Sequence, residues 1–548
     1  MSERRSFVRK VVYIAAVAVL FLPLYQISAP ATRATTARTG SQGGILAQLR
    51  TEYQLSQADL GEIDPASETI KLATLGMRGV AANVLWTKAN YYKKTENWTE
   101  FGATLEQITK IQPNFISVWQ YQGWNLSYNV SVEFDDYRDR YYWVIRGIKF
   151  IKEGIKYNED DPNLLWDIGW FIAQKIGRAD EHKQFRQLFK DDDDFHPPLA
   201  ERSRERRDNW LVGKEWFRTA EDAVYVKGKS LRRHDGRSKA EYVFNSHAPM
   251  CQINYAQVIE GEGVLGERAR QAWIEGLEDW IDFGNKELYN SAGVRYHLND
   301  AEAYHQEAEE RNKELDALAP GLRKKIETER RDALPEDLRQ ALELPAGQHT
   351  PMQAGLARDA QEQITVTAIE LADQIEAAEP EKGMKAHRLA SQVARAHGKA
   401  AVIQSARRTI NYDYWKMRCE FEQTSEALEA RALTYTAGQS FRDAKLILAK
   451  EQYEQGLRKW REAIDGYPKM GRDPSLGDDL IEAIQKYRNV LDQLDESFPA
   501  DFPLLDILER HDDENEFRDV LQELKGTDAP EAAREDTTED TEAETDAG

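Results

Sequence analysis

The chain has 548 residues, enough for roughly two to four domains. Hydrophobic residues make up 41% of it, which can bury a sizeable core, while the mean hydropathy of −0.69 predicts a largely polar surface. The formal net charge of −22 argues against general nucleic-acid binding, because affinity for phosphates requires clustered Lys and Arg. Cys251 and Cys419 are the two cysteines and form no CxxC pair, which excludes a disulfide framework and a cysteine zinc site.

Residues 1–31 combine a basic flank with an apolar stretch. Four Lys and Arg side chains lie between Arg4 and Lys10, and Val11 to Ala29 follows without a charge. An apolar helix needs about 20 residues to cross the hydrocarbon core, so this stretch is just long enough. Positive charge before it predicts a single-pass anchor in the inner (cytoplasmic) membrane, with the bulk of the chain outside. The alternative is a signal peptide cleaved near the small residues of Ser28 to Ala34, giving a secreted or periplasmic chain.

The rest of the chain is predicted to be all-α. Apolar residues recur at spacings of three and four, alternating strand patterns are scarce, and Pro and Gly fall between the periodic segments. Met384 to Thr436 has few breakers and suggests one very long helix or a helical hairpin with coiled-coil character. We expect these segments: a flexible tether at 32–67, repeats at 68–190, an irregular and helical region at 191–300, long charged helices at 301–437, a C-terminal repeat-like hairpin with further helices at 438–526, and a disordered acidic tail at 527–548.

A repeat begins near residue 82. Leu85, Ala89 and Tyr92 recur as Trp119, Gly123 and Leu126, at a spacing of 34 residues. The pattern resembles the tetratricopeptide repeat, a helix–turn–helix hairpin in which a small residue at position 8 lets two helices approach and a proline at position 32 ends the second. The first unit fills positions 4, 8, 11, 17, 24, 27 and 32 of the frame with Leu85, Ala89, Tyr92, Trp98, Leu105, Ile108 and Pro113.

Later units are less regular. The second keeps Trp119 and Gly123, but its matching proline is Pro162, well beyond the position where Gly147 stands. A third reuses the spacing as Leu165, Gly169 and Ile172. Near the C-terminus, LAKEQYEQGLRKWREAIDGYP looks like a degenerate hairpin of the same type. A generic helical bundle is the alternative to this repeat interpretation.

In a tetratricopeptide-like array the first helices of successive units line a groove. Positions 2, 5 and 9 of the three units predict that face: Asn83, Trp86 and Asn90; Ser117, Gln120 and Trp124; Asn163, Trp166 and Trp170. A face rich in Trp and Asn suits an extended peptide or another polar chain, through stacking and side-chain amide hydrogen bonds. The alternative is that these tryptophans pack against neighbouring helices.

No catalytic or metal site is expected, and no cofactor. The chain contains no GxxxxGK[ST], HExxH or GxSxG motif. His247 and Cys251 lie four residues apart in SHAPMCQINYA, but their apolar neighbours favour a buried structural thiol. Asp191 to Asp194 lacks the alternating spacing of a calcium loop and is interpreted as a solvated loop. The glycosylation sequons at Asn97, Asn125 and Asn129 are interpreted as chance matches.

Residues 75–163 also resemble an uncharacterised family of membrane-anchored bacterial repeat proteins, found especially in planctomycetes. The resemblance rests on RGVAANVLW, ITKIQPNFISVWQYQGWNLSYNVS and DPNLLWDIGW, and later on SHAPMCQINYA and FGNKEL. Members are sometimes labelled "iron responsive element", but no set of iron ligands or RNA-binding surface here matches that label. The resemblance implies placement at the envelope and no mechanism.

Together these patterns predict a non-enzymatic, membrane-anchored, exported scaffold that binds a protein partner through its repeats, with no nucleic acid expected. The alternative is an enzyme or enzyme subunit that acts on envelope polymers held in the Trp-lined groove. A deep pocket that gathers two carboxylates would favour the enzyme, and a long groove without converging polar groups would favour the scaffold.

Overall fold

The computed structural model describes Ile45 and residues 78–231, 239–513 and 515–527. The described chain is almost entirely helical, as the sequence predicts, and it divides after Lys239 into two compact units. Its one pair of strands, β1 (Leu288–Tyr289) and β2 (Arg295–Tyr296), is a short antiparallel hairpin with Leu288 opposite Tyr296. Within these residues no helix has both the length and the apolar character needed to cross a membrane. The predicted anchor lies outside the described residues, as do the tether (32–67) apart from Ile45 and the acidic tail (527–548) apart from Thr527.

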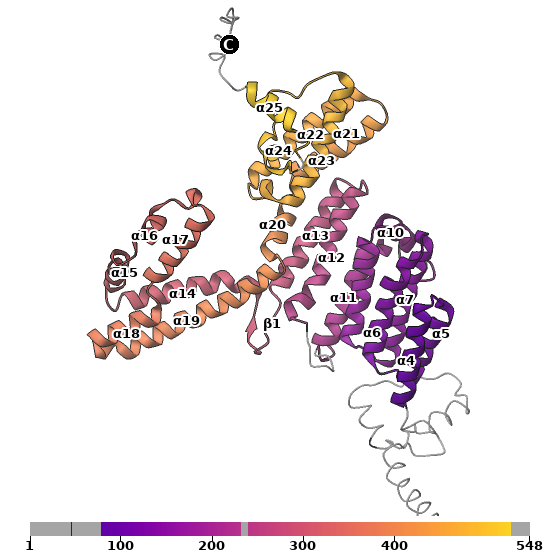
Figure 1. Cartoon of the computed structure of the whole chain (residues 1–548), viewed down its shortest axis with the longest axis horizontal. Helices are drawn as coiled ribbons and strands as arrows, with labels where there is room; N and C mark the ends of the chain where they lie inside the picture. Colours follow the sequence, from indigo (N-terminus) through magenta and orange to yellow (C-terminus); the bar gives the residue numbers. More distant parts are fainter. Residues whose placement is uncertain (1–44, 46–77, 232–238, 514, 528–548) are drawn as a thin grey trace, which may run out of the picture. The chain divides into compact units, whose positions relative to one another are not determined.

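The first unit is a side-by-side array of helices (Figure 1). Side chains that precede the helices fix where several of them begin: Asn97, Asp136, Asp161 and Asp208 each accept a hydrogen bond from a backbone N–H of the first turn. The helices are α4 (Arg78–Lys94), α5 (Trp98–Ile111), α6 (Ile116–Trp124), α7 (Tyr137–Tyr157), α8 (Pro162–Trp170), α9 (Ile176–Arg178), α10 (His182–Lys190) and α11 (Asn209–Tyr225).

In two hairpins, glycines let the two paired helices touch each other. A Cβ on Gly147 of α7 would lie 2.7 Å from the carbonyl oxygen of Gly123 of α6, and one on Gly123 would lie 2.3 Å from Ile151. Between α8 and α11, a Cβ on Gly213 would lie 3.3 Å from the carbonyl oxygen of Gly169. Gly123 and Gly169 occupy position 8 of the sequence frame, where Ala89 of α4 is also buried. The small residue expected at this position therefore does lie at the closest approach of paired helices.

The third hairpin differs from the sequence expectation in its second helix. The helix that packs along α8 is α11, and α9 and α10 are inserted between them. The first unit consequently extends to Lys239, beyond the predicted end of the repeats at residue 190. The insertion is held by buried ion pairs, in which the Asp208 carboxylate binds Arg186 at 2.8 Å and Lys190 at 3.0 Å.

The second unit begins with another hairpin, of α12 (Glu241–Gly261) and α13 (Glu267–Gly284). After β1 and β2, α14 (Ala301–Asp316) runs along the longest helix, α19 (Pro380–Thr409) (Figure 1). The helices between them are α15 (Leu322–Asp332), α16 (Glu336–Glu343), α17 (Pro351–Ile364) and α18 (Ala368–Ala378). The remaining helices are α20 (Tyr412–Glu422), α21 (Ser425–Arg442), α22 (Leu446–Gly466), α23 (Pro474–Leu494), α24 (Leu505–His511) and α25 (Arg518–Thr527).

Two sequence expectations are corrected in this unit. The segment from Met384 to Thr436 is neither one helix nor a hairpin of two. It spans α19, α20 and part of α21, because α19 ends where Asn411 adopts a positive φ of 51° and Thr424 caps α21. The predicted C-terminal hairpin is the single helix α22, because its apolar residues keep one helical period through Gly456. Its hairpin partner is α21, where Gly456 packs against Thr434.

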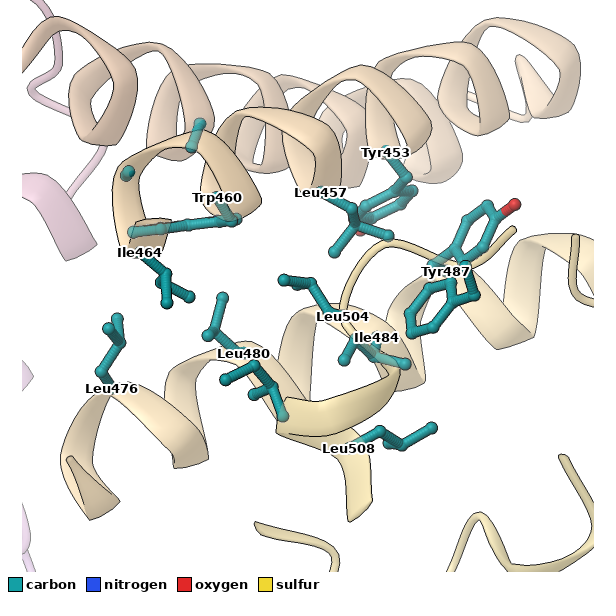
Figure 2. Close-up of a cluster of buried hydrophobic side chains, with 14 of the residues drawn as sticks. Tyr453, Leu457, Trp460, Ile464, Leu476, Leu480, Ile484, Tyr487, Leu504 and Leu508 are labelled. Atoms are coloured by element: carbon teal, nitrogen blue, oxygen red, sulfur yellow. The ribbon is translucent and has the colours of Figure 1, made fainter. Parts of the chain in front are cut away.

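The C-terminal helices enclose a core of their own. Figure 2 shows Tyr453, Leu457, Trp460 and Ile464 of α22 directed toward Leu480 and Ile484 of α23, with Leu504 and Leu508 alongside. These residues recur every three or four positions, so the helical period alone places them on one face. Tyr453 and Tyr487 also meet at 6.1 Å between ring centroids.

Replacement of Gly147 by Ala should destabilise the α6–α7 hairpin by about 2–3 kcal/mol, because the added methyl group meets backbone atoms that cannot move aside. Replacement of Gly102 by Ala is the matched control, since its nearest neighbour is the flexible guanidinium of Arg146 at 2.6 Å. Hydrogen exchange of α6 and α7 amides in the full chain measures both effects. Equal protection in the two variants would contradict the close-packing account.

Candidate functional site

The candidate site is the face formed by α4, α6 and α8, the first helices of the three hairpins. Aromatic rings meet on it in pairs. Trp86 of α4 contacts Tyr121 of α6 with 5.6 Å between ring centroids. Trp124 stacks on Tyr128 at 5.8 Å and 17° between ring planes. We call Trp86, Tyr121 and Trp124 the aromatic row.

π-helical turns follow the tryptophans of two first helices. Asn125–Val130 (η1) continues α6 after Trp124, and Phe171–Lys175 (η3) continues α8 after Trp170. In both units the π-helix begins directly after a Gly-Trp pair, at the same position relative to Trp119 and Leu165. A π-turn widens the helix locally and is frequent at functional sites. Its recurrence at one position of two units marks this face as a repeated feature.

Tyr128 lies at the centre of the cluster created by these turns. Its ring meets Phe171 edge-on at 5.5 Å, and the Lys175 ammonium lies 4.9 Å from the ring centroid. Burial raises the pKa of the Tyr128 hydroxyl, and a hydrogen bond with Trp170 opposes this rise. Burial also lowers the pKa of Lys175. The cluster therefore joins η1 to α8 and η3 and leaves one side of Trp124 in solvent.

The predicted site residues fall into an exposed and a buried group. Trp124 keeps 45% of its surface exposed, and the adjacent Tyr121 keeps 48%. Trp86, Gln120 and Trp170 are half-buried, while Asn83, Asn90 and Ser117 are exposed. Seven of the predicted residues are therefore available along the first helices, with Tyr121 beside them.

Asn163 and Trp166 are a correction to the predicted face, because both side chains are buried. Trp166 stacks on Trp170 at 5.3 Å and meets Phe217 of α11 at 5.4 Å. The Lys239 ammonium covers the remaining side of its ring, 3.7 Å from the centroid. For Trp166 the alternative interpretation, packing against neighbouring helices, is therefore the correct one.

A polar contact links α6 and α8, the first helices of the second and third hairpins. Gln120 of α6 donates a hydrogen bond to the Asp167 carboxylate of α8, and Lys239 lies 3.7 Å from the same carboxylate. At the other end of α6, Asn125 accepts hydrogen bonds from Lys93 at 2.8 Å and Asn129 at 2.7 Å. Asp167 is the one acidic residue in α4, α6, η1, α8 and η3. The face is therefore aromatic and amide-rich, with few charges.

Sequence reasoning missed four contributors: Tyr121, Tyr128, Lys175 and Lys239. Tyr121 lies four residues after Ser117 and three before Trp124, so a slightly wider stripe on the helical wheel would have included it. Tyr128 and Lys175 lie beyond π-helical turns, which shift the register of a helix relative to the regular period. Lys239 comes from outside the predicted repeats, and no local pattern indicated its contact with Trp166.

The other sequence candidates have structural partners. Of the acidic loop, Asp191 binds Arg204 at 2.6 Å and Asp193 binds Arg207 at 2.8 Å, so the acidic and basic runs neutralise each other. Cys251 and Cys419 are both buried. In the described part of the chain, no three His, Cys, Asp or Glu side chains are placed to hold a metal ion.

The sequons have structural explanations as well. Asn125 is buried within the hydrogen bonds described above, and Ser127 donates a hydrogen bond to the Val144 carbonyl at 3.1 Å. Asn97 caps α5 by accepting a hydrogen bond from the backbone N–H of Glu100. Asn97 therefore stabilises the start of α5, and Asn125 and Ser127 connect neighbouring helices of the array.

Comparison of the chain with protein-family models and with curated proteins finds no match in either case.

Substitution of two tryptophans of α6 should distinguish a side chain that stabilises the fold from one that lies at the surface. Trp119 is buried against Gly154, so Trp119→Ala should cost about 3–5 kcal/mol of unfolding free energy. Trp124 is half exposed and loses mainly its stacking on Tyr128, so Trp124→Ala should cost about 1 kcal/mol. Hydrogen exchange of the α6 and α7 amides checks the difference. A loss at Trp124 as large as that at Trp119 would show that Trp124 is a core residue.

Proposed function

We propose that this chain is a tetratricopeptide-like scaffold that binds a protein partner along the face of α4, α6 and α8. The observation that carries the proposal is the exposed aromatic row, which crosses from α4 to α6 through the contact between Trp86 and Tyr121. Exposed tryptophan and tyrosine held by packing are the side chains that contribute most to binding at protein interfaces. Tyr128 and Phe171 fix the row from beneath, which lowers the entropy lost on binding.

The chemistry of the face favours an extended, largely uncharged segment of the partner. Asn83, Asn90 and Gln120 offer side-chain amides that can pair with a peptide backbone, and the rings between them offer flat apolar surface. Catalysis by paired carboxylates, the alternative from the sequence, would need a second acid beside Asp167, and these helices do not carry one.

Two features support the tetratricopeptide-like interpretation of the array. The spacing of 34 residues relates Leu85, Ala89 and Tyr92 to Trp119, Gly123 and Leu126. Ala89, Gly123 and Gly169, at position 8, are all buried, and the two glycines lie where paired helices touch. The third hairpin departs from the repeat through its insertion of α9 and α10.

We further propose that the scaffold acts at the inner membrane, held there by residues 11–29 with the helical units on the outer side. The support is the uncharged stretch preceded by basic residues. An anchor confines the binding face near the membrane and raises its effective concentration toward membrane partners.

Binding can be tested with a photocrosslinking residue in place of Tyr121, in the full chain in its native membrane. One dominant protein adduct is expected, and Trp124→Ala should reduce it about tenfold or more, because a central aromatic contributes about 2 kcal/mol or more. The matched control places the photocrosslinking residue at Tyr142, a tyrosine of the second helix α7 that is slightly more exposed than Tyr121. The same adduct from position 142, or an adduct at 121 unaffected by Trp124→Ala, would refute the assignment.

Membrane attachment has a separate test. The full chain should remain in the membrane pellet after alkaline carbonate extraction, and a variant that lacks residues 1–31 should be released, because the uncharged stretch is removed. A mature chain that begins near residues 28–34 and is released by carbonate would support signal cleavage instead. Release of the intact, uncleaved chain would contradict both forms of the proposal.

A further inference from the structure

A buried ionic cluster connects four helices of the second unit. Arg418 of α20 binds Glu422 of the same helix at 2.7 Å and Asp473, which caps α23, at 3.1 Å. Arg431 of α21 binds the same Glu422 at 2.6 Å and lies 3.4 Å from Glu260 of α12. Asp479 of α23 completes the group, 3.5 Å from Arg431 and 3.8 Å from Arg418.

The charges of this cluster do not balance. Four carboxylates share two guanidiniums. Glu422, which is fully buried, has the shortest contacts and binds both arginines. Glu260 is 95% buried but has only the longer contact with Arg431, and its Oε1 accepts no hydrogen bond from the described residues. Glu260 is therefore the carboxylate least compensated for its loss of water.

The electrostatics of the surrounding groups agree with this ranking. Burial raises the pKa of Glu260 to about 7; Arg431 of α21 opposes the rise, Glu422 of α20 adds to it, and Trp273 of α13 and Arg418 of α20 oppose it more weakly. Burial alone would raise the pKa of Glu422 as well, but Arg431 and Arg418 hold it below its usual range. Burial raises the pKa of Asp479 of α23.

We propose that Glu260 is a proton switch within the second unit: its protonation closes the packing of α12 against α20 and α21, and its ionisation loosens it. The same helices meet a second time at the end of α12, where the space beside Gly263 is filled by the hydroxyl of Tyr435 from α21. A negative charge on Glu260 adds to a cluster that already has more carboxylates than guanidiniums. The free-energy cost of this buried charge falls when water reaches it.

The direction of the pH effect follows from linkage. The folded state holds the Glu260 proton more tightly than the unfolded chain does, so its contribution to stability is complete below about pH 4.5 and is lost as the pH rises to about 7. Over that window the population of the loosened state relative to the closed state should increase by about 100-fold.

The test measures the distance between α13 and α22 with spin labels at the exposed residues Gln271 and Gln455 of the full chain. The wild type should give a narrow distance distribution at pH 5.5 and a broader, longer one at pH 8. Glu260→Gln keeps the shape of the side chain and removes its charge, so it should give the narrow distribution at both values.

Glu278→Gln provides the matched control, because Glu278 is an exposed carboxylate of α13 outside the cluster, and it should keep the wild-type response. A wild-type distribution that does not change with pH would overturn the proposal. A pH response that persists in Glu260→Gln would assign it to another group and overturn the proposal equally.

Discussion

The close contact of paired helices through glycine is the constraint on which the first unit depends. Gly123 and Gly147 bring α6 and α7 together, and Gly169 and Gly213 do the same for α8 and α11. A Cβ at either glycine of the first pair would lie too close to atoms of the facing helix, so larger side chains would push α6 and α7 apart. The close packing also places Trp119 in the core against Gly154. Trp124 follows five residues later, about 140° around a regular helix, and so faces outward.

The face proposed to bind a partner is a consequence of this packing. Because the first helices are fixed by their partners, the rings of Trp86, Tyr121 and Trp124 gather on one surface without burying one another completely. The π-helical turns after Trp124 and Trp170 then bring Tyr128 and Lys175 beneath the row. A rigid surface with exposed aromatics, amides and few charges is suited to recognition of a neutral chain, and this is why we favour a scaffold.

The sequence predicted the class of the fold and the helix-packing positions, because both follow from periodicity and residue size. Ala89, Trp119 and Gly123 lie where the 34-residue frame placed them. The sequence could not predict that Trp166 is covered by Phe217 and Lys239, since α11 is separated from α8 by an insertion without a repeat signature. The break at Asn411 was missed because one residue with a positive φ leaves almost no trace in the apolar pattern. The ionic cluster around Glu422 joins residues too far apart in the sequence for local rules to connect.

The central claim, that the α4–α6–α8 face is the surface that engages a partner, is tested most directly by radical footprinting of the chain in intact cells and after purification. The account predicts that Trp124 and Tyr121 are strongly protected in the cells and become reactive on purification, while Tyr142 of α7 reacts equally in both. Equal labelling of Trp124 in the two preparations, or protection centred on Tyr142, would contradict it.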